Sequence, residues 1–97
     1  MQILTDDEIQ TLLNDQPHWT LASGKLVSEW TFSDFVAAMA FVNQIAAIAE
    51  AEGHHPDIDI RYNRVTLALV THDAGGITDR DADMAKRISA QLDRKQA

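Results

Sequence analysis

The sequence contains no cysteine among its 97 residues. This absence excludes disulfide bonds, thiolate metal sites and a cysteine nucleophile, and it is compatible with a reducing compartment, so we expect a cytoplasmic protein. Basic residues are also scarce, with eight Lys and Arg against fifteen Asp and Glu and a net charge of -7. A chain of this charge repels phosphate backbones, which disfavours nucleic-acid binding.

We find no apolar run that we expect to span a bilayer, and the first residues lack the basic-then-apolar pattern of a signal segment. We therefore expect no membrane association. What the chain does contain is the balance of a soluble globular protein, with 45% apolar and 24% charged residues. Its length suits a single domain over residues 1–97, and a domain this small often gains burial by association.

The first third of the chain predicts a helix followed by a β-hairpin. Thr5 and Glu8 have the spacing of a capping box, and Pro17 ends the helix that follows. Residues 19–32 are typical of two strands joined by a turn at Ser23–Gly24. That turn places these large apolar side chains on one face: Trp19, Leu21, Leu26, Trp30 and Phe32.

A long apolar helix is predicted next, capped by Ser33 and ended by Gly53. Its apolar residues form one stripe at Phe35, Met39, Val42, Ala46 and Ala49, and a second at Phe41, Ile45 and Ile48. A four-stranded sheet covers only one flank of such a helix, so we expect the helix over 33–52 to form a homo-oligomer interface. The alternative is that the N-terminal helix covers the second flank within one subunit.

A second hairpin is predicted over residues 57–71, where apolar and charged side chains alternate along the first strand. We expect a two-residue turn at Asn63–Arg64. The pairs expected on the buried face are then Tyr62 with Val65, Ile60 with Leu67 and Ile58 with Leu69. In this register Tyr62 is a core residue.

The same register gathers histidines at one end of the sheet. Extended outward, it places His55 opposite His72, with Cβ atoms roughly 5 Å apart. Glu50 and His54 are four residues apart, so a helix that continues to its glycine projects both toward this end. Neighbouring histidines can differ in protonation at neutral pH, because imidazole titrates near a pKa of about 6.5, and such a cluster suits acid/base chemistry.

The last helix opens with Thr78 and Asp81 at capping-box spacing, after a flexible link over 74–76. Its core stripe is Ala82, Ala85, Ile88 and Leu92. The predicted order is therefore α-β-β-α-β-β-α. We expect an α+β fold in which helices pack on one face of a four-stranded antiparallel sheet.

One spacing pattern extends across the second half of the chain. Glu50 is separated by three residues from the tripeptide His54-His55-Pro56, and Tyr62, His72 and Asp81 follow at fixed gaps. This pattern closely resembles the signature of the pterin-4a-carbinolamine dehydratases. The resemblance extends from about Trp19 to the end of the last helix, and several elements at fixed gaps are more specific than any one motif.

The resemblance implies a hydro-lyase that converts a 4a-hydroxytetrahydropterin into a quinonoid dihydropterin in tetrahydropterin recycling, with no redox step, no cofactor and no obligatory metal. It links the enzyme functionally to an aromatic amino-acid hydroxylase. Carried over by position, the catalytic residues are His54, His55 and His72, and the substrate-binding residues are Glu50 and Asp81. Many relatives have an aromatic residue two positions after the proline, where this chain has Ile58, and Trp19 is the candidate to compensate.

Plainer readings and other functions stay open at this point. Asp81 has the position of a helix-capping carboxylate, Glu50 that of a solvated residue, and a His-His-Pro stretch is often a surface turn. Three histidines and a carboxylate also suit a zinc hydrolase, although neighbours on a strand, such as His54 and His55, point to opposite faces. A third possibility is a non-catalytic module that binds a helical partner through the apolar helix.

Overall fold

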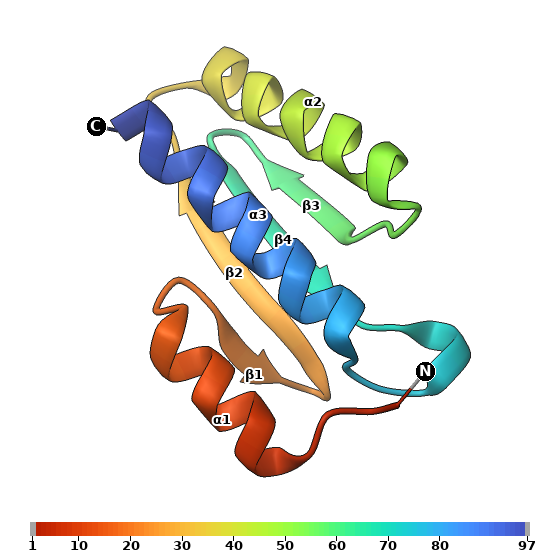
Figure 1. Cartoon of the computed structure of the whole chain (residues 1–97). Helices are drawn as coiled ribbons and strands as arrows, with labels where there is room; N and C mark the ends of the chain where they lie inside the picture. The colour runs from red at the N-terminus through yellow and green to blue at the C-terminus, as the bar shows by residue number, and fades with distance from the viewer. Residues whose placement is uncertain (1, 97) are drawn as a thin grey trace.

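The computed structural model describes the backbone of residues 2–96 and the side chains of residues 2–92. In Figure 1 the helices lie on one face of a single sheet, with α3 between α1 and α2. The elements in chain order are α1 (Asp6–Asp15), β1 (Thr20–Ala22), β2 (Lys25–Thr31), α2 (Phe35–Glu52), β3 (Asp57–Arg61), β4 (Arg64–Leu69), a 3₁₀ turn (His72–Ala74) and α3 (Asp79–Gln96). The predicted fold class and element order are thus confirmed.

The sheet is antiparallel, with strand order β1-β2-β4-β3. Strand β4 occupies a central position, and its alternate residues Val65, Leu67 and Leu69 are fully buried beneath the helices. The helices contribute Phe41 and Ile45 from α2 and the predicted α3 stripe to the same core. Burying one such side chain contributes roughly 1.5–3 kcal/mol, so this single layer of contacts supplies much of the stability of a small domain.

The N-terminal predictions agree with the structure. Thr5 Oγ1 accepts a hydrogen bond from the Glu8 N–H at 3.1 Å, and Glu8 Oε1 accepts from the Thr5 N–H at 2.9 Å, which completes the capping box. The turn between β1 and β2 is Ser23–Gly24, with φ of 52° and 75°. Trp19 is 2% exposed, and its indole N–H donates to Ser89 Oγ at 2.9 Å.

Helix α2 begins at Phe35, one residue later than a cap at Ser33 predicts. Asp34, and not Ser33, is the capping residue, because Asp34 Oδ1 accepts from the Ala37 N–H at 2.8 Å. Gly53 ends the helix in the left-handed conformation at φ 65°, as predicted. Its apolar surface is only partly used within the subunit, since Phe35 and Val36 remain 49% and 75% exposed.

The expectation that no run could span a bilayer is wrong for α2 on length and composition alone. This helix has a mean hydropathy of 1.3 over its 18 residues. Within residues 2–96 it is the one helix that is long and apolar enough to cross a membrane. Only 22% of that stretch is buried inside the subunit. Its buried side, however, packs Phe41 and Ile45 into the core in the manner of a core helix of a globular domain.

The second hairpin turns one residue earlier than predicted, at Tyr62–Asn63. The observed pairs are Ile60 with Val65 and Ile58 with Leu67. Asn63 is fixed by the neighbouring strand, because its Nδ2 donates to the Phe32 carbonyl at 2.9 Å and its own carbonyl accepts from the Phe32 N–H at 2.8 Å. The prediction that Tyr62 is a core residue is therefore wrong: it has φ 53° in the turn and is 66% exposed.

This change shifts the register by two residues. Because side chains alternate with a period of two, the paired strand residues still lie on their predicted faces of the sheet. The last β3–β4 pair is Asp57 with Ala68, and the same register extended outward sets His55 level with Val70. The predicted pairing of His55 with His72 across the ladder is wrong. His72 instead lies in the 3₁₀ turn that follows β4.

Candidate active site

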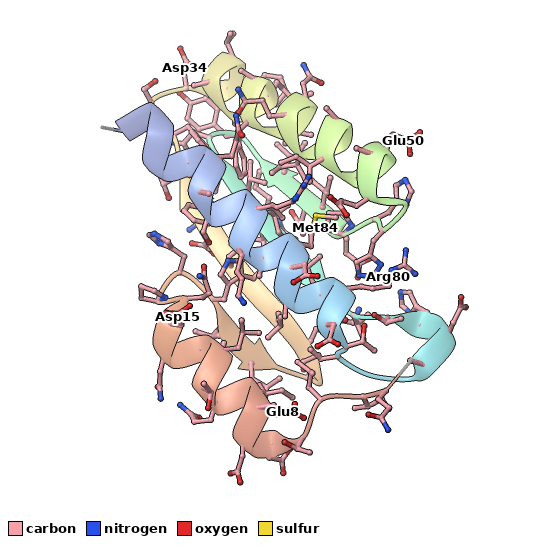
Figure 2. The ribbon with its side chains drawn as sticks, in the orientation of Figure 1. Glu8, Asp15, Asp34, Glu50, Arg80 and Met84 are labelled. Carbon is pink, nitrogen blue, oxygen red and sulfur yellow. The ribbon has the colours of Figure 1, made fainter. Side chains whose placement is uncertain are left out.

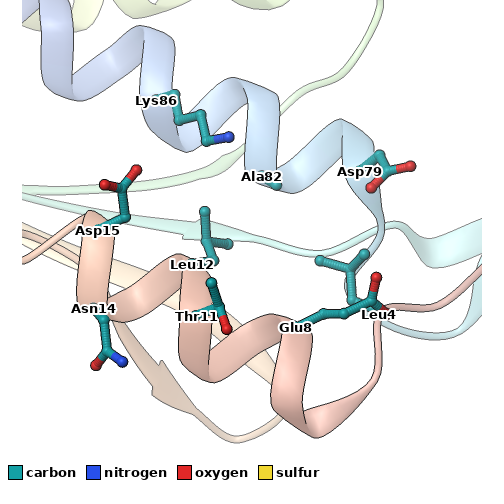
Figure 3. Close-up of a pocket in the computed structure, with 9 residues that line it drawn as sticks. All are labelled: Leu4, Glu8, Thr11, Leu12, Asn14, Asp15, Asp79, Ala82 and Lys86. Carbon is teal, nitrogen blue, oxygen red and sulfur yellow. The ribbon is translucent and has the colours of Figure 1, made fainter.

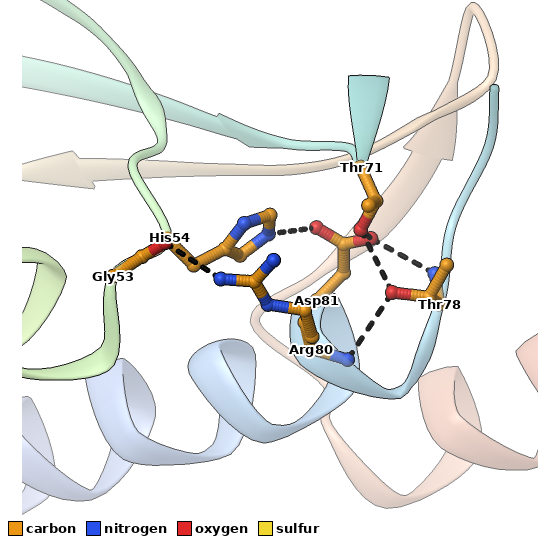
Figure 4. Close-up of polar contacts among 6 residues, drawn as sticks. All are labelled: Gly53, His54, Thr71, Thr78, Arg80 and Asp81. Carbon is orange, nitrogen blue, oxygen red and sulfur yellow. Dashed lines mark hydrogen bonds and ion pairs between the residues drawn. The ribbon is translucent and has the colours of Figure 1, made fainter. Parts of the chain in front are cut away.

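The central contact of the site joins the end of α2 to the start of α3. The His54 Nε2 atom lies 2.6 Å from Asp81 Oδ1 (Figure 4), and the two side chains are 10% and 0% exposed. Gly53 turns the chain out of α2 so that His54 enters the interior directly after the helix. The contact ties together two segments that are 27 residues apart in the sequence.

Asp81 has hydrogen bonds to both carboxylate oxygens. Its Oδ2 accepts from the Thr71 hydroxyl at 2.8 Å and from the Thr78 N–H at 2.9 Å. The second of these bonds is half of a capping box at the start of α3, so the plain helix-capping reading of Asp81 is correct. The other carboxylate oxygen is left for His54, so one side chain both caps α3 and contacts the histidine.

This arrangement indicates which nitrogen of the neutral His54 ring carries the proton. An ionised carboxylate only accepts hydrogen bonds, so His54 Nε2 carries the proton that is shared with Asp81. In the neutral ring the lone pair is then on Nδ1, which receives no hydrogen bond from the described residues. The neutral ring of His54 thus has one nitrogen that donates to Asp81 and one that can accept a hydrogen bond.

His55 forms a second, exposed pair. Its Nε2 contacts Glu50 Oε2 across the last turn of α2, and the two side chains are 62% and 78% exposed. Glu50 therefore contacts His55 and not His54. The plain reading of Glu50 as a solvated helix residue describes its exposure, and the hydrogen bond to His55 adds a partner at the edge of the depression.

His72 is exposed in the 3₁₀ turn, and its ring makes no hydrogen bond with the described residues. It nevertheless borders the same depression as the other two rings. This depression is about 250 Å³ and is lined by Gly53, His54, His55, Val70, Thr71, His72, Asp73 and Arg80. The three histidines thus share one surface hollow, although the ladder does not pair them.

Arg80 forms one wall of this hollow, and sequence reasoning missed it. Its Nη2 donates to the Gly53 carbonyl at 2.6 Å, which fastens the first turn of α3 to the end of α2. Figure 2 shows Glu50 and Arg80 on the same side of the molecule. Arg80 is adjacent to Asp81 at the start of a predicted helix, which was the available signal for a cation near the histidines.

Two of the sequence candidates lie elsewhere. Trp19 is in the core against Ser89 and does not line the depression, so it cannot replace an aromatic wall there. Ile58 is 39% exposed on β3 and is also outside the lining. Thr71 and Thr78, by contrast, were not predicted as site residues, yet both contact Asp81.

The metal alternative depends on several ligands converging on one point. Among the described residues, no group of three or more His, Cys, Asp or Glu side chains is arranged to hold a metal ion. The Nε2 atoms of His54 and His55 are instead directed at separate carboxylates. Neither pair leaves the Nε2 atom open for a shared ion.

A larger groove lies between α1 and α3, away from the histidines. It has a volume of about 530 Å³, with Leu4, Leu12 and Ala82 at its apolar floor and Glu8, Asp15, Asp79 and Lys86 among its charged lining (Figure 3). Its polar lining residues are exposed and contain no imidazole. Size alone does not make it the reactive site, because its charged side chains are ordinary exposed ones and the histidines lie around the other depression.

Comparisons of the sequence with known proteins identify one family. The sequence profile of a family described as pterin 4 alpha carbinolamine dehydratase matches residues 2–91. A protein of Acidobacterium capsulatum, named provisionally as a pterin-4-alpha-carbinolamine dehydratase, is 59% identical over 92 residues, which cover 95% of this chain and 100% of that relative. A similarly named protein of Chloroflexus aurantiacus is 51% identical over 91% of this chain and 95% of its own.

The fold has a solved counterpart as well. A crystal structure from Brucella melitensis, described as a transcriptional coactivator/pterin dehydratase, has a TM-score of 0.87 and 34% sequence identity. The match covers 92% of this chain and 97% of that chain.

Proposed function

Because the chain belongs to the pterin 4 alpha carbinolamine dehydratase family, we propose that it removes water from a 4a-hydroxytetrahydropterin to give a quinonoid dihydropterin. One observation carries the proposal. His54, fixed by the buried Asp81, borders the same depression as His55 and His72. Acid/base groups are what this reaction requires, since it involves neither oxidation nor reduction.

The proposed reaction needs one proton acceptor and one proton donor. The C4a–O bond breaks as the lone pair on N5 forms a C4a=N5 double bond, and the N5 proton is lost. The departing hydroxyl takes up a proton and leaves as water. The atoms and charges balance without an added reactant, so the side chains only have to accept, donate and orient.

We assign proton acceptance to His54. Its Nε2 proton is held by Asp81, so the neutral ring has its lone pair on Nδ1. When the ring takes up the N5 proton, the carboxylate at 2.6 Å stabilises the imidazolium that forms. Asp81 is in this assignment a positioning residue, and not a contact of the pterin.

The donor comes from one of the two exposed rings. His55 is paired with the Glu50 carboxylate, so its Nε2 atom already has a hydrogen-bond partner at the edge of the depression. His72 has a ring that makes no hydrogen bond with the described residues and is free to contact the departing hydroxyl or the pterin. Single alanine substitutions at these positions identify the donor, because loss of the donor lowers kcat whereas loss of a binding contact mainly raises KM.

The test is a dehydration assay on freshly generated 4a-hydroxytetrahydropterin. We expect the parent protein to accelerate the reaction and His72→Ala to reduce turnover by about 10²-fold, the usual range for losing one acid/base group. His18→Ala is the matched control, because His18 packs against Trp30 in a tilted arrangement, with ring centroids 4.7 Å apart, and does not line the depression. A His72→Ala rate within a factor of two of the parent would remove His72 from the mechanism.

The proposed dehydration would use the product of another enzyme, one that forms the 4a-hydroxytetrahydropterin. Aromatic amino-acid hydroxylases form this compound, so we propose a functional link to such an enzyme through the shared pterin. Addition of the protein to a hydroxylase reaction should shorten the lifetime of the 4a-hydroxy species. An unchanged lifetime at equal protein concentration would count against the link.

We also propose that α2 forms a homo-oligomer interface. The helix leaves Phe35 at 49% and Val36 at 75% exposure, an apolar surface that costs free energy in water. Val36→Asp should reduce the mass measured by light scattering at micromolar concentration to that of a monomer. A monomeric parent protein would overturn this proposal.

The second candidate function is a non-catalytic binding module, favoured by the same exposed apolar helix. The Brucella melitensis relative is itself described as a transcriptional coactivator as well as a pterin dehydratase. In this case a variant without His54, His55 and His72 would still bind its protein partner, and Val36→Asp would not. Loss of the dehydration reaction in the histidine-less variant, with the oligomer unchanged, favours the enzyme.

A further inference from the structure

A pair of buried hydroxyl groups stands behind the His54–Asp81 contact. The Thr71 and Thr78 hydroxyl oxygens are 2.7 Å apart, and the two residues are 3% and 0% exposed. The Thr71 hydroxyl also donates to Asp81 Oδ2 at 2.8 Å (Figure 4). We propose that Thr71 and Thr78 are positioning residues that orient Asp81 and, through it, fix which nitrogen of His54 carries the proton.

The hydroxyl protons of this group can be arranged in only one way. Thr71 has a single hydroxyl proton, and the Asp81 carboxylate takes it. Thr78 must therefore donate its own hydroxyl proton to Thr71 Oγ1, and Thr78 Oγ1 accepts from the Arg80 N–H at 3.3 Å. The hydrogen bonds form a directed chain that ends on the carboxylate.

This direction matters at the far side of Asp81. Two donors, the Thr71 hydroxyl and the Thr78 N–H, occupy Oδ2 and fix the plane of the carboxylate. Oδ1 is then aimed at His54 Nε2 as an acceptor, which requires a proton on Nε2. The proposed function uses the lone pair that this leaves on Nδ1, so the inference rests on that function and supplies the reason for its proton acceptor.

Thr71 and Thr78 also flank the loop that carries His72. Thr71 N–H donates to the Gly76 carbonyl at 3.0 Å, and the Thr71 carbonyl accepts from the Ala74 and Gly75 N–H groups at 3.1 and 3.0 Å. The N-terminal segment holds the far end of this loop, since the Leu4 N–H donates to the Ile77 carbonyl at 2.8 Å. The threonine pair therefore links the His72 loop to the His54–Asp81 contact.

The decisive experiment separates orientation from packing. Valine has nearly the shape of threonine, so Thr71→Val keeps the volume and removes the donor to Asp81. We expect kcat to fall about 10-fold with KM within twofold, and Thr71→Ser to restore kcat to within twofold of the parent. Thr66→Val is the matched control, because Thr66 alternates with the buried residues of β4 and lies on the open face of the sheet.

A spectroscopic signature accompanies the kinetics. In ¹⁵N NMR spectra at a pH where the ring is neutral, His54 of the parent should show the Nε2-protonated tautomer, with its signals assigned by comparison with His54→Ala. Thr71→Val should add the Nδ1-protonated form, whereas Thr66→Val should not. A purely structural role for Thr71 would alter stability and leave the tautomer unchanged.

The outcomes remain separable from those of the proposed function. If the parent has no dehydratase activity but Thr71→Val shifts the His54 tautomer, the function is wrong and the positioning inference stands. A folded Thr71→Val protein with the parental tautomer and kcat within twofold overturns the inference. If Thr71→Val does not fold, Thr71→Ala, which adds no bulk, is measured against the same two criteria.

Discussion

His54 and His55 are adjacent in the chain, and each presents its Nε2 atom to a carboxylate oxygen, yet the two pairs have opposite surroundings. The side chains of His54 and Asp81 are 10% and 0% exposed, whereas those of His55 and Glu50 are 62% and 78% exposed. Asp81 also accepts from two further donors. The exposed Glu50 side chain accepts no further hydrogen bond from the described residues.

The difference teaches what a carboxylate can do for an imidazole. A buried pair with all its donors satisfied is costly to break, and it has one geometry, so it can fix a tautomer. An exposed pair is weakened by the dielectric of water and by salt, and its two flexible side chains lose entropy when they meet. The buried pair is therefore suited to orientation, and the exposed pair to a modest electrostatic effect at the rim of the hollow.

The largest expected effect comes from changing the buried carboxylate to an amide. In Asp81→Asn, the amide oxygen must take the place of Oδ2, since the amide NH₂ would otherwise oppose the Thr78 N–H, donor against donor. The NH₂ then faces His54 Nε2 and moves the ring proton to Nδ1. We expect kcat in the dehydration assay to fall by about 10³-fold or more, within the range for losing an acid/base group and approaching the roughly 10⁴-fold loss known when a histidine-orienting carboxylate becomes an amide.

Asp83→Asn is the control for this change, because Asp83 is exposed two residues further along α3. Its kcat should equal that of the parent. A loss smaller than about tenfold in Asp81→Asn would mean that the buried pair does not act differently from the exposed one.

The next effect is on stability. Asp81→Ala leaves the Thr71 hydroxyl and the Thr78 N–H buried without their acceptor, so the free energy of unfolding should fall by about 3 kcal/mol. Glu50→Ala removes an exposed partner and should change it by less than about 0.5 kcal/mol. Urea denaturation with unchanged m-values measures both. Equal losses in the two variants would contradict the distinction between buried and exposed pairs.

The sequence predicted the layers and faces of this fold because those depend on periodicity. Alternation along residues 57–71 survives a register shift of two, since the side-chain period of a strand is also two. The turn itself was misplaced, because the bonds from Asn63 to Phe32 join residues that are 31 positions apart. No local pattern reports such a contact.

The candidate site was predictable to a similar depth. The spacing of Glu50, the His-His-Pro stretch, His72 and Asp81 located the end of the sheet where the imidazoles gather. It did not reveal that His54 pairs with Asp81 while His55 pairs with Glu50. Thr71 was invisible for the same reason, because an ordinary threonine becomes part of the site only when the fold brings it to Asp81.

The smallest expected effect tests the exposed pair directly. Glu50→Gln removes the charge beside His55 but keeps the size of the side chain, and an exposed ion pair contributes only about 0–1 kcal/mol. We therefore expect kcat to change by no more than about threefold at low salt, and the difference from the parent to shrink at about 0.5 M NaCl, where charges are screened within a few ångströms. Glu52→Gln is the matched control on the same helix, because Glu52 pairs with Arg87 and not with a histidine. A loss of about 10²-fold in Glu50→Gln alone would place the exposed pair in the same class as the buried one, and the assignment of separate roles to His54 and His55 would fail.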